Sequence, residues 1–203
     1  MKPMSHSKRY WKLGLWLIDL LAWLHFPFKK AFRLALKFKV NQQGYSRSAL
    51  TYGETPYPVL AQMMMKAKAQ PGQVFLECGC GFGRLSLWAA RGWRLQVLGI
   101  ELVPQFVSAA ERMGQMLGID DVRFVCGDMF EENWGGADIV YVTSTTFSNE
   151  LRERLNSKWS ELSPGTHIFT LTYPPVSENL TVVSSEVFLF SWGPSTLFHA
   201  IVL

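Results

Sequence analysis

The sequence predicts an α/β domain, in which a largely parallel sheet ends in an antiparallel hairpin and follows an apolar, basic helical segment. Three observations predict it: short apolar runs alternate with helical segments, a glycine-rich turn joins the first run to a helix, and a turn separates the last two runs. With 203 residues, 48% of them hydrophobic and 18% charged, the chain suffices for one well-buried domain. This composition excludes disordered, collagen-like and disulfide-scaffold classes.

The first 49 residues, which we call the leader, differ in charge from the rest of the chain. They hold ten Lys or Arg residues against one acid, Asp19, a formal charge of +9. Residues 50–203 hold ten basic residues against fifteen acids, a charge of −5. We therefore expect two units, a basic leader over residues 1–49 and an acidic body over residues 50–203.

Residues 13–28 of the leader form an apolar run of sixteen residues in which only Asp19 and His25 are ionisable. A membrane-spanning helix needs about 20 residues, and a central acid costs about 3 kcal/mol on insertion scales. Basic clusters flank the run on both sides, which favours an interfacial or short membrane anchor. A helix docked on the domain's own core, an uncleaved signal-like segment and a nucleic-acid-binding segment are the alternatives. Three tryptophans suit a bilayer interface: Trp11, Trp16 and Trp23.

Residues 29–40 satisfy two patterns, a helix with a basic stripe and a strand with alternating apolar and basic residues. Both patterns keep basic side chains beside apolar ones. We expect residues 8–40 to bind an anionic membrane surface at its cytoplasmic face, and we expect no nucleic-acid partner.

The body alternates predicted strands with predicted helices. A helix over residues 57–69 precedes a strand over 74–77, and a second helix begins near Arg84. The remaining elements follow in order: a strand over 96–100, a helix over 103–116, strands over 122–125 and 137–143, a helix through 159 capped by Ser148, a turn at 162–165, and a hairpin over 188–203 broken at 192–195.

Cysteine and histidine positions give no metal signature. The three cysteines are an odd number, and Cys78 and Cys80 share a glycine-rich loop, so a reducing compartment is the simpler interpretation. A structural zinc site needs four ligands at a recognisable spacing, and we expect none here. His167 and His199 fall inside apolar strands and are expected to be packed.

The glycine-rich turn distinguishes between cofactors. Glu77 ends the first strand, and Gly79, Gly81 and Gly83 follow at alternate positions. A dinucleotide fingerprint would place its last glycine at position 84, which is Arg84. The turn instead resembles the first motif of class I S-adenosylmethionine-dependent methyltransferases, and the element order is similar to their Rossmann-like seven-stranded sheet with its C-terminal antiparallel hairpin.

A closer resemblance covers roughly residues 50–203. It is to the catalytic core of the disruptor-of-telomeric-silencing histone lysine methyltransferases, and it is carried by Tyr52-Gly53-Glu54-Thr55-Pro56, Leu60-Ala61-Gln62-Met63, Gly127-Asp128 with Glu131, Glu132 and Trp134, Leu151-Arg152-Glu153-Arg154-Leu155, and Ser191-Trp192. The chain is also similar to the membrane-anchored lysine methyltransferases of the ATP-synthase c-subunit type, which join a hydrophobic N-terminal segment to such a core.

The resemblance implies a cofactor, S-adenosyl-L-methionine, and the residues that bind it. Tyr52, Glu54 and Thr55 would fold over its methionine end. The other implied contacts are Glu77 with Gly79, Gly81 and Gly83 near the amino-acid and ribose portions, Glu101 at the ribose hydroxyls, and Asp128 with Met129 at the adenine.

The acceptor end departs from the histone enzymes. Where those enzymes have Asn-Asn-Phe after the fourth strand, this chain has Thr143-Ser144-Thr145, so Thr143 and Ser144 are the candidates for contacting the substrate. We expect a membrane-associated methyltransferase acting on the nitrogen of protein lysine side chains. The alternatives are a small-molecule or lipid-headgroup methyltransferase and a non-catalytic membrane-binding module.

Overall fold

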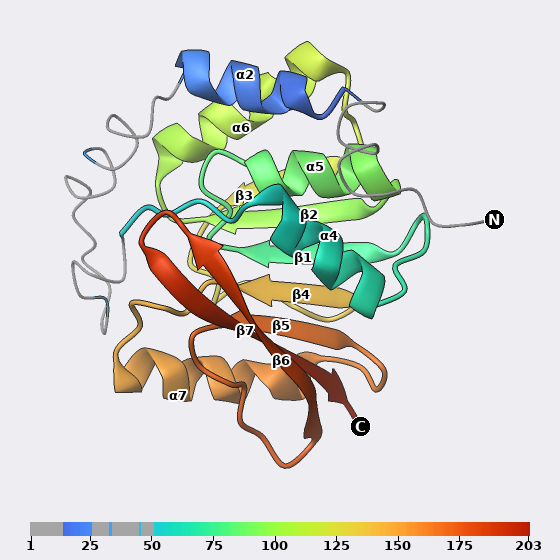
Figure 1. Ribbon diagram of the computed structural model, residues 1–203, viewed down its shortest axis with the longest axis vertical. Coiled ribbons are helices and arrows are strands. Elements are labelled where there is room, and N and C mark those ends of the chain that lie inside the picture. The colour runs from blue at the N-terminus through green and yellow to red at the C-terminus, as the bar shows by residue number, and fades with distance from the viewer. Residues whose placement is uncertain (1–13, 26–32, 34–44, 46–50) are drawn as a thin grey trace.

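The computed structural model describes residues 14–25, 33, 45 and 51–203. Within these residues, seven strands form one sheet in the order β3-β2-β1-β4-β5-β7-β6, shown in Figure 1. Strand β7 runs antiparallel to both of its neighbours, and the other adjacent pairs are parallel. The strands are β1 (Val74–Cys78), β2 (Gln96–Glu101), β3 (Val122–Cys126), β4 (Ile139–Val142), β5 (His167–Leu171), β6 (Leu180–Phe190) and β7 (Gly193–Val202). The predicted α/β class and terminal hairpin are confirmed.

Helices cover both faces of the sheet. Successive strand side chains point to opposite faces, so Phe75 and Tyr141 join the core under one set of helices while Leu76 and Val140 join the core on the other. The first face carries α4 (Tyr57–Lys66), α5 (Arg84–Trp93) and α6 (Pro104–Leu117). The second carries α7 (Asn149–Lys158) and the short helix η2 (Trp159–Glu161).

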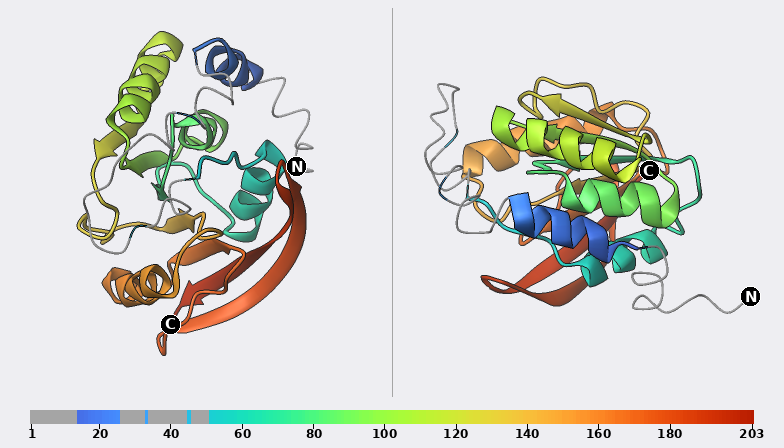
Figure 2. Two further views of the ribbon diagram at one scale, coloured as in Figure 1. Left: turned by 90° about the vertical axis from the view of Figure 1, so that its left-hand side faces the viewer. Right: turned by 90° about the horizontal axis from the view of Figure 1, so that it is seen from above.

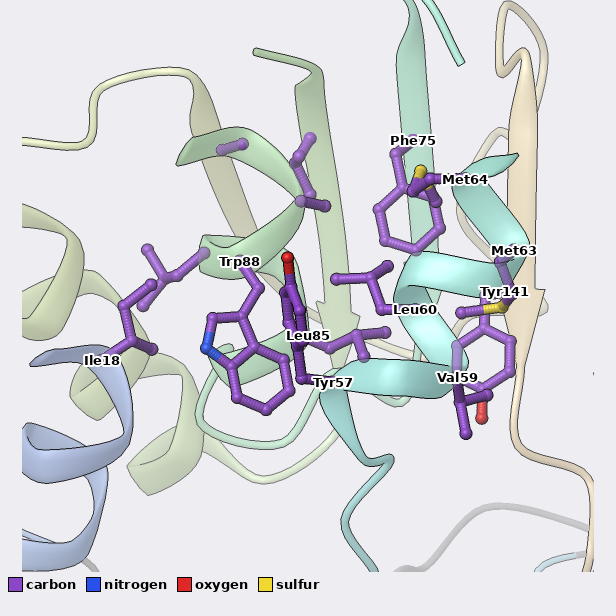
Figure 3. Packing of buried hydrophobic residues seen from close by; sticks show 14 of the residues in the cluster. Ile18, Tyr57, Val59, Leu60, Met63, Met64, Phe75, Leu85, Trp88 and Tyr141 are labelled. Atoms are coloured by element: carbon purple, nitrogen blue, oxygen red, sulfur yellow. The ribbon is translucent and has the colours of Figure 1, made fainter. Parts of the chain in front are cut away.

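The leader supplies helix α2 (Trp16–His25), which packs against α5 and α6, as Figure 2 shows. Leu15, Ile18 and Ala22 are buried in the same core as those helices. Figure 3 shows Ile18 close to Trp88 of α5, and the Trp88 indole nitrogen lies 3.4 Å from the carbonyl oxygen of Leu15. Residues 14–25 therefore adopt the docked arrangement, one of the alternatives expected for the leader.

The outward face of α2 is apolar as well. Trp16, Leu20, Trp23 and Leu24 are 38% to 67% exposed. In the described ranges, no helix combines the length and the apolar character needed to cross a bilayer. Trp11, the basic clusters around the run, and the helix or strand expected over residues 29–40 (Arg33 apart) lie outside the described residues.

The hairpin begins earlier than the sequence predicts. Strand β6 starts at Leu180, whereas the prediction placed the hairpin over residues 188–203. β6 is an edge strand, and most of its side chains are exposed on both faces. An edge strand of this kind carries no clean apolar alternation, so residues 180–187 lack the pattern that predicts a strand.

The cysteines and the two strand histidines, His167 and His199, are all among the described residues. All three cysteines are free, with Cys78 and Cys80 buried and Cys126 exposed. In the part of the chain that the structure describes, no three His, Cys, Asp or Glu side chains gather as a metal site. His167 and His199 stack with ring centroids 5.1 Å apart, and their Nδ1 and Nε2 atoms lie 2.8 Å apart, so the packed arrangement is confirmed.

Candidate active site

A cavity of about 550 Å³ opens at the carboxyl ends of the parallel strands. Strand β1 lies between β2 and β4, and the helices that follow β1 and β4, α5 and α7, lie on opposite faces of the sheet. In sheets of this kind, ligands bind where the strand order reverses in this way. The volume is within the range of pockets for small molecules and cofactors. Most of the predicted site residues line it: Tyr52, Glu54, Thr55, Glu77, Gly79, Gly81, Glu101, Met129 and Thr143.

The turn after β1 brings the main chain to the cavity. Gly79, Gly81 and Gly83 all adopt positive φ angles, which favour glycine. A Cβ on Gly79 would meet no atom within 4 Å, so the main chain there faces open space. A Cβ on Gly83 would instead lie 2.5 Å from the Phe124 ring. Gly83 does not line the cavity, and its role is close packing of α5 against the sheet.

Glu77 is a buried carboxylate at the end of β1. Its Oε2 atom accepts a hydrogen bond from the Ser86 hydroxyl on α5. The pKa of Glu77 is raised to about 8, mainly by burial. The hydrogen bonds from Ser86 lower this pKa, and the nearby charge of Glu101 raises it. Burial disfavours the charged form of this carboxyl group, and a positive charge beside it favours that form. A cationic ligand would therefore stabilise the ionised Glu77.

Glu101 ends β2, the strand next to β1, and also lines the cavity. Its Oε2 accepts from the Gly81 amide at 2.9 Å, and its Oε1 accepts from the Val103 amide at 2.8 Å. Burial raises the pKa of Glu101, and these backbone hydrogen bonds lower it. The carboxylate therefore ties the glycine turn to the start of α6.

The loop 51–55 forms another wall. The Tyr52 ring stacks on Phe82 at a centroid distance of 5.3 Å, and its hydroxyl donates to Glu54 at 3.0 Å. Glu54 also pairs with Arg84, and the Thr55 hydroxyl lies 2.8 Å from the Tyr141 hydroxyl. These contacts connect the loop to α5 and to β4.

Asp128 follows β3 but does not line the cavity itself. Its Oδ1 accepts from the Tyr45 hydroxyl at 2.7 Å and from the Phe130 amide at 3.0 Å, and its Oδ2 lies 3.7 Å from Arg154. Burial and the bond to Asp128 raise the pKa of Tyr45 well above its ordinary value. At this wall the cavity is lined by Tyr45 and by Gly127 and Met129, the neighbours of Asp128 in sequence.

The two candidates for substrate contact separate. Thr143 lines the cavity and its hydroxyl donates to the Tyr141 hydroxyl at 3.2 Å. Ser144 is buried and turned away, with its hydroxyl donating to the Leu171 carbonyl at 2.8 Å. Successive residues of an extended chain point to opposite sides, so only one of an adjacent pair can face the cavity.

Tyr45, Arg84 and Phe106 are among the lining residues that sequence reasoning missed. Arg84 entered only as the residue that breaks the dinucleotide fingerprint. Tyr45 lies in a stretch without a motif, and Phe106 belongs to the apolar face of a helix that reads as core. Neither the stretch around Tyr45 nor the apolar helix face of Phe106 indicates a place in the cavity.

Comparison with solved structures gives the class of protein. The chain superimposes on an RNA methyltransferase from Salinibacter ruber bound to S-adenosyl-L-homocysteine with a TM-score of 0.63 and 25% identity, over 73% of this chain and 93% of that one. With the glycine turn and the acids that end β1 and β2, the match makes this a class I S-adenosylmethionine-dependent methyltransferase. Its cofactor is S-adenosyl-L-methionine.

The family is more particular. Residues 36–187 match the family described as histone methylation protein DOT1, and the chain belongs to that family. It is 27% identical over 145 residues to a protein-lysine N-methyltransferase from Saccharolobus islandicus, covering 70% of this chain and 80% of that protein. It is 28% identical over 140 residues to the histone-lysine N-methyltransferase, H3 lysine-79 specific, from Yarrowia lipolytica. That match covers 62% of this chain, and the chain spans only 28% of the length of the yeast enzyme.

Proposed function

We propose that this methyltransferase transfers a methyl group to the side-chain amine of a protein lysine, at the cytoplasmic face of a membrane. The observation that carries the choice of acceptor is the match of residues 36–187 to the histone methylation family, together with the lysine-specific names of the relatives from Saccharolobus and Yarrowia.

The cavity suits the proposed mode of cofactor binding. Three carboxylates and one guanidinium line it, which favours a ligand that carries positive charge. Glu77 would hold the cofactor's ammonium group and Glu101 its ribose hydroxyls, with the main chain at Gly79 leaving room for the ligand. Met129 and Tyr45 would contact the adenine, while Asp128 orients Tyr45 through their hydrogen bond. Tyr52, Glu54 and Thr55 would close over the methionine end.

The chemistry requires alignment more than proton transfer. When bound, the sulfonium cofactor would supply an electrophilic methyl group to the lone pair of a deprotonated amine, with S-adenosyl-L-homocysteine as the leaving group. Such a step needs no covalent enzyme intermediate, and holding the reacting atoms about 3 to 3.5 Å apart supplies much of the rate. The residues of this chain therefore act mainly by orienting both partners and by excluding water.

Hydroxyl groups gather where an acceptor would enter. The hydroxyls of Thr55 and Thr143 both contact the hydroxyl of Tyr141. Burial raises the pKa of Tyr141 to about 12, so at neutral pH the phenol keeps its proton and serves as a donor. Thr55 and Thr143 line the cavity, and their uncharged hydroxyls would orient an amine, with the buried Tyr141 hydroxyl behind them.

The exposed face of α2 supports the membrane part of the proposal. Trp16, Leu20, Trp23 and Leu24 recur at helical spacing on the side away from the core. The leader that contains them has a formal charge of +9. Apolar and aromatic side chains beside many basic residues match the chemistry of an anionic bilayer surface.

The acceptor is tested by methylating a membrane extract with radiolabelled S-adenosyl-L-methionine and the full chain, and then separating protein from lipid. Label on protein that mass spectrometry assigns to lysine supports the proposal, and Glu101→Gln should abolish it. Label confined to the lipid fraction would overturn the proposal in favour of a lipid-headgroup acceptor, which is the second candidate. This candidate is favoured by the hydroxyl side chains at positions 143–145, where the histone enzymes have Asn-Asn-Phe.

Membrane binding is tested separately by sedimentation with vesicles that contain about one third phosphatidylserine. Full chain should sediment at low salt, and Trp23→Ser with Leu24→Ser should weaken this strongly. Met116→Ser is the matched control, because Met116 is 60% exposed on α6 and lies outside the proposed surface. Equal sedimentation of the control and the double variant would contradict the assignment of the α2 face.

A further inference from the structure

We infer that Asp19, in the leader helix α2, sets the affinity of the cofactor site through Arg84. Arg84 thereby becomes a positioning residue that links the docked leader to the loop 51–55. The inference rests on the cofactor site described above and is independent of the methyl acceptor and of the membrane.

Arg84 is the first residue of α5, directly after the glycine turn. Its Nε lies 3.3 Å from Asp19 Oδ1, and its Nη1 donates to Glu54 Oε2. The guanidinium carbon lies 4.5 Å from the centre of the Trp88 ring. The planar fork of an arginine can satisfy two carboxylates in fixed directions while stacking on an aromatic ring, so these contacts hold it in one orientation.

The chain of contacts continues into the cavity. Glu54 accepts from the Tyr52 hydroxyl through its other oxygen, and the Tyr52 ring packs on Phe82 and lies 5.4 Å from the Phe106 ring. Tyr52, Glu54 and Arg84 all line the cavity, whereas Asp19 does not. The ion pair with Arg84 therefore connects Asp19 to the residues that line the cavity.

The position of Asp19 calls for such a role. Leu15, Ile18 and Ala22 supply the buried apolar surface of the docked α2, and Asp19 adds a charged contact with α5 from the middle of the same apolar run. The Asp19 carboxylate is 31% exposed and the Arg84 side chain 21% exposed, so water screens the pair only partly. Asp19 orients the guanidinium from the leader side, and Glu54 then holds Tyr52 over the cavity.

Calorimetric titration of the full chain with S-adenosyl-L-homocysteine tests the inference. We expect Asp19→Asn to weaken binding about fivefold, a typical coupling between sites. In a double-mutant cycle, Asp19→Asn should add little to the loss caused by Glu54→Gln, because both act through the same guanidinium. Asp19→Glu keeps the negative charge, so this variant should bind the ligand more tightly than Asp19→Asn. A general loss of helix packing would not produce that difference.

Glu186→Gln is the matched control. Glu186 pairs with Lys66 at 3.6 Å, and these side chains are 44% and 24% exposed, so the variant also removes one partly exposed ion pair. It should leave the dissociation constant unchanged while shifting the thermal midpoint by about as much as Asp19→Asn. Unchanged ligand affinity in Asp19→Asn, or equal losses in both variants, would overturn the inference. Failure of the unmodified chain to bind the ligand would overturn the cofactor site as well.

Discussion

Trp192 lies so close to Gly53 that a Cβ built on the glycine would be 2.5 Å from the ring carbon Cζ3. Trp192 belongs to the turn between β6 and β7, and Gly53 to the loop 51–55. Both line the cavity, so the C-terminal hairpin and the loop before α4 meet at its wall. The indole stacks on Phe190 at 4.8 Å, and its nitrogen donates to the Ser195 hydroxyl at 3.0 Å.

Gly53→Ala should therefore displace the indole and weaken cofactor binding. Overpacking of this kind costs about 1 to 3 kcal/mol. Because Trp192 is 40% exposed and can move outward, we expect part of this cost as lost ligand affinity and part as a lower free energy of unfolding. Titration calorimetry and thermal unfolding measure the two parts. Gly114→Ala in α6 is the control, since its Cβ would make ordinary contacts at 3.5 Å and should be neutral or stabilising.

The raised pKa of Glu77 predicts a pH-dependent stability. The carboxyl binds a proton more tightly in the folded chain, with a pKa of about 8, than in the unfolded chain, near 4.5. Its contribution to stability is therefore complete below about pH 4.5 and is lost as the pH rises towards 8, by up to about 1.4 kcal/mol per pH unit. Urea unfolding of the cofactor-free protein from pH 5 to pH 8.5 should show this slope.

Glu77→Gln should flatten that slope, because the amide does not titrate. Glu153→Gln, on the exposed side of α7, should keep the slope of the unmodified chain. Cofactor binding at pH 7.5 should also release protons, which calorimetry in two buffers of different ionisation enthalpy would detect. The assignment of Glu77 to the ammonium group would fail if the heats were equal after correction for dilution.

Tyr45→Phe should weaken cofactor binding and lower stability. The substitution removes the 2.7 Å hydrogen bond to the buried Asp128 carboxylate, and losing a partner of a buried charged group costs about 1 to 3 kcal/mol. Chemical unfolding and ligand titration are the measurements. Tyr173→Phe is the comparison, because Tyr173 lies outside the cavity; similar loss of affinity in both variants would contradict a role for Tyr45.

The stacked histidines predict acid sensitivity. Burial, the neighbouring His167 and the charge of Lys66 lower the pKa of His199 to about 4, below the ordinary value of 6.5. The associated stability is present above pH 6.5 and is lost as the pH falls towards 4. His199→Phe keeps the stack on Phe169 and removes the titration, so the free energy of unfolding should fall less between pH 7.5 and pH 4.5 than it does in the unmodified chain. A variant that stays as acid-sensitive as the unmodified chain would refute this cause.

Much of the site could be predicted because its residues follow strands in sequence. The resemblance to the methyltransferase family assigns Glu77, Gly79, Gly81 and Glu101 to the cofactor, and the structure places all four on the cavity wall. Parallel strands end at the same edge of a sheet, so a position after a strand implies a position in space. Asp128 and Ser144 follow strands too, but side-chain direction turns them away, and position alone does not give direction.

By itself, the sequence determined the α/β class, the glycine turn with its acids and the charge of the leader, because each depends on residues near one another in the chain. Only the tertiary structure decided that Asp19 meets Arg84, that Trp192 meets Gly53 and that Tyr45 meets Asp128, pairs separated by 65, 139 and 83 positions in the numbering. Such contacts exist because helices and hairpins pack on the sheet to bury apolar surface, and the polar pairing follows from that packing. Asp19, the acid that makes the leader a poor membrane span, is in the folded chain the partner of Arg84 at the start of α5.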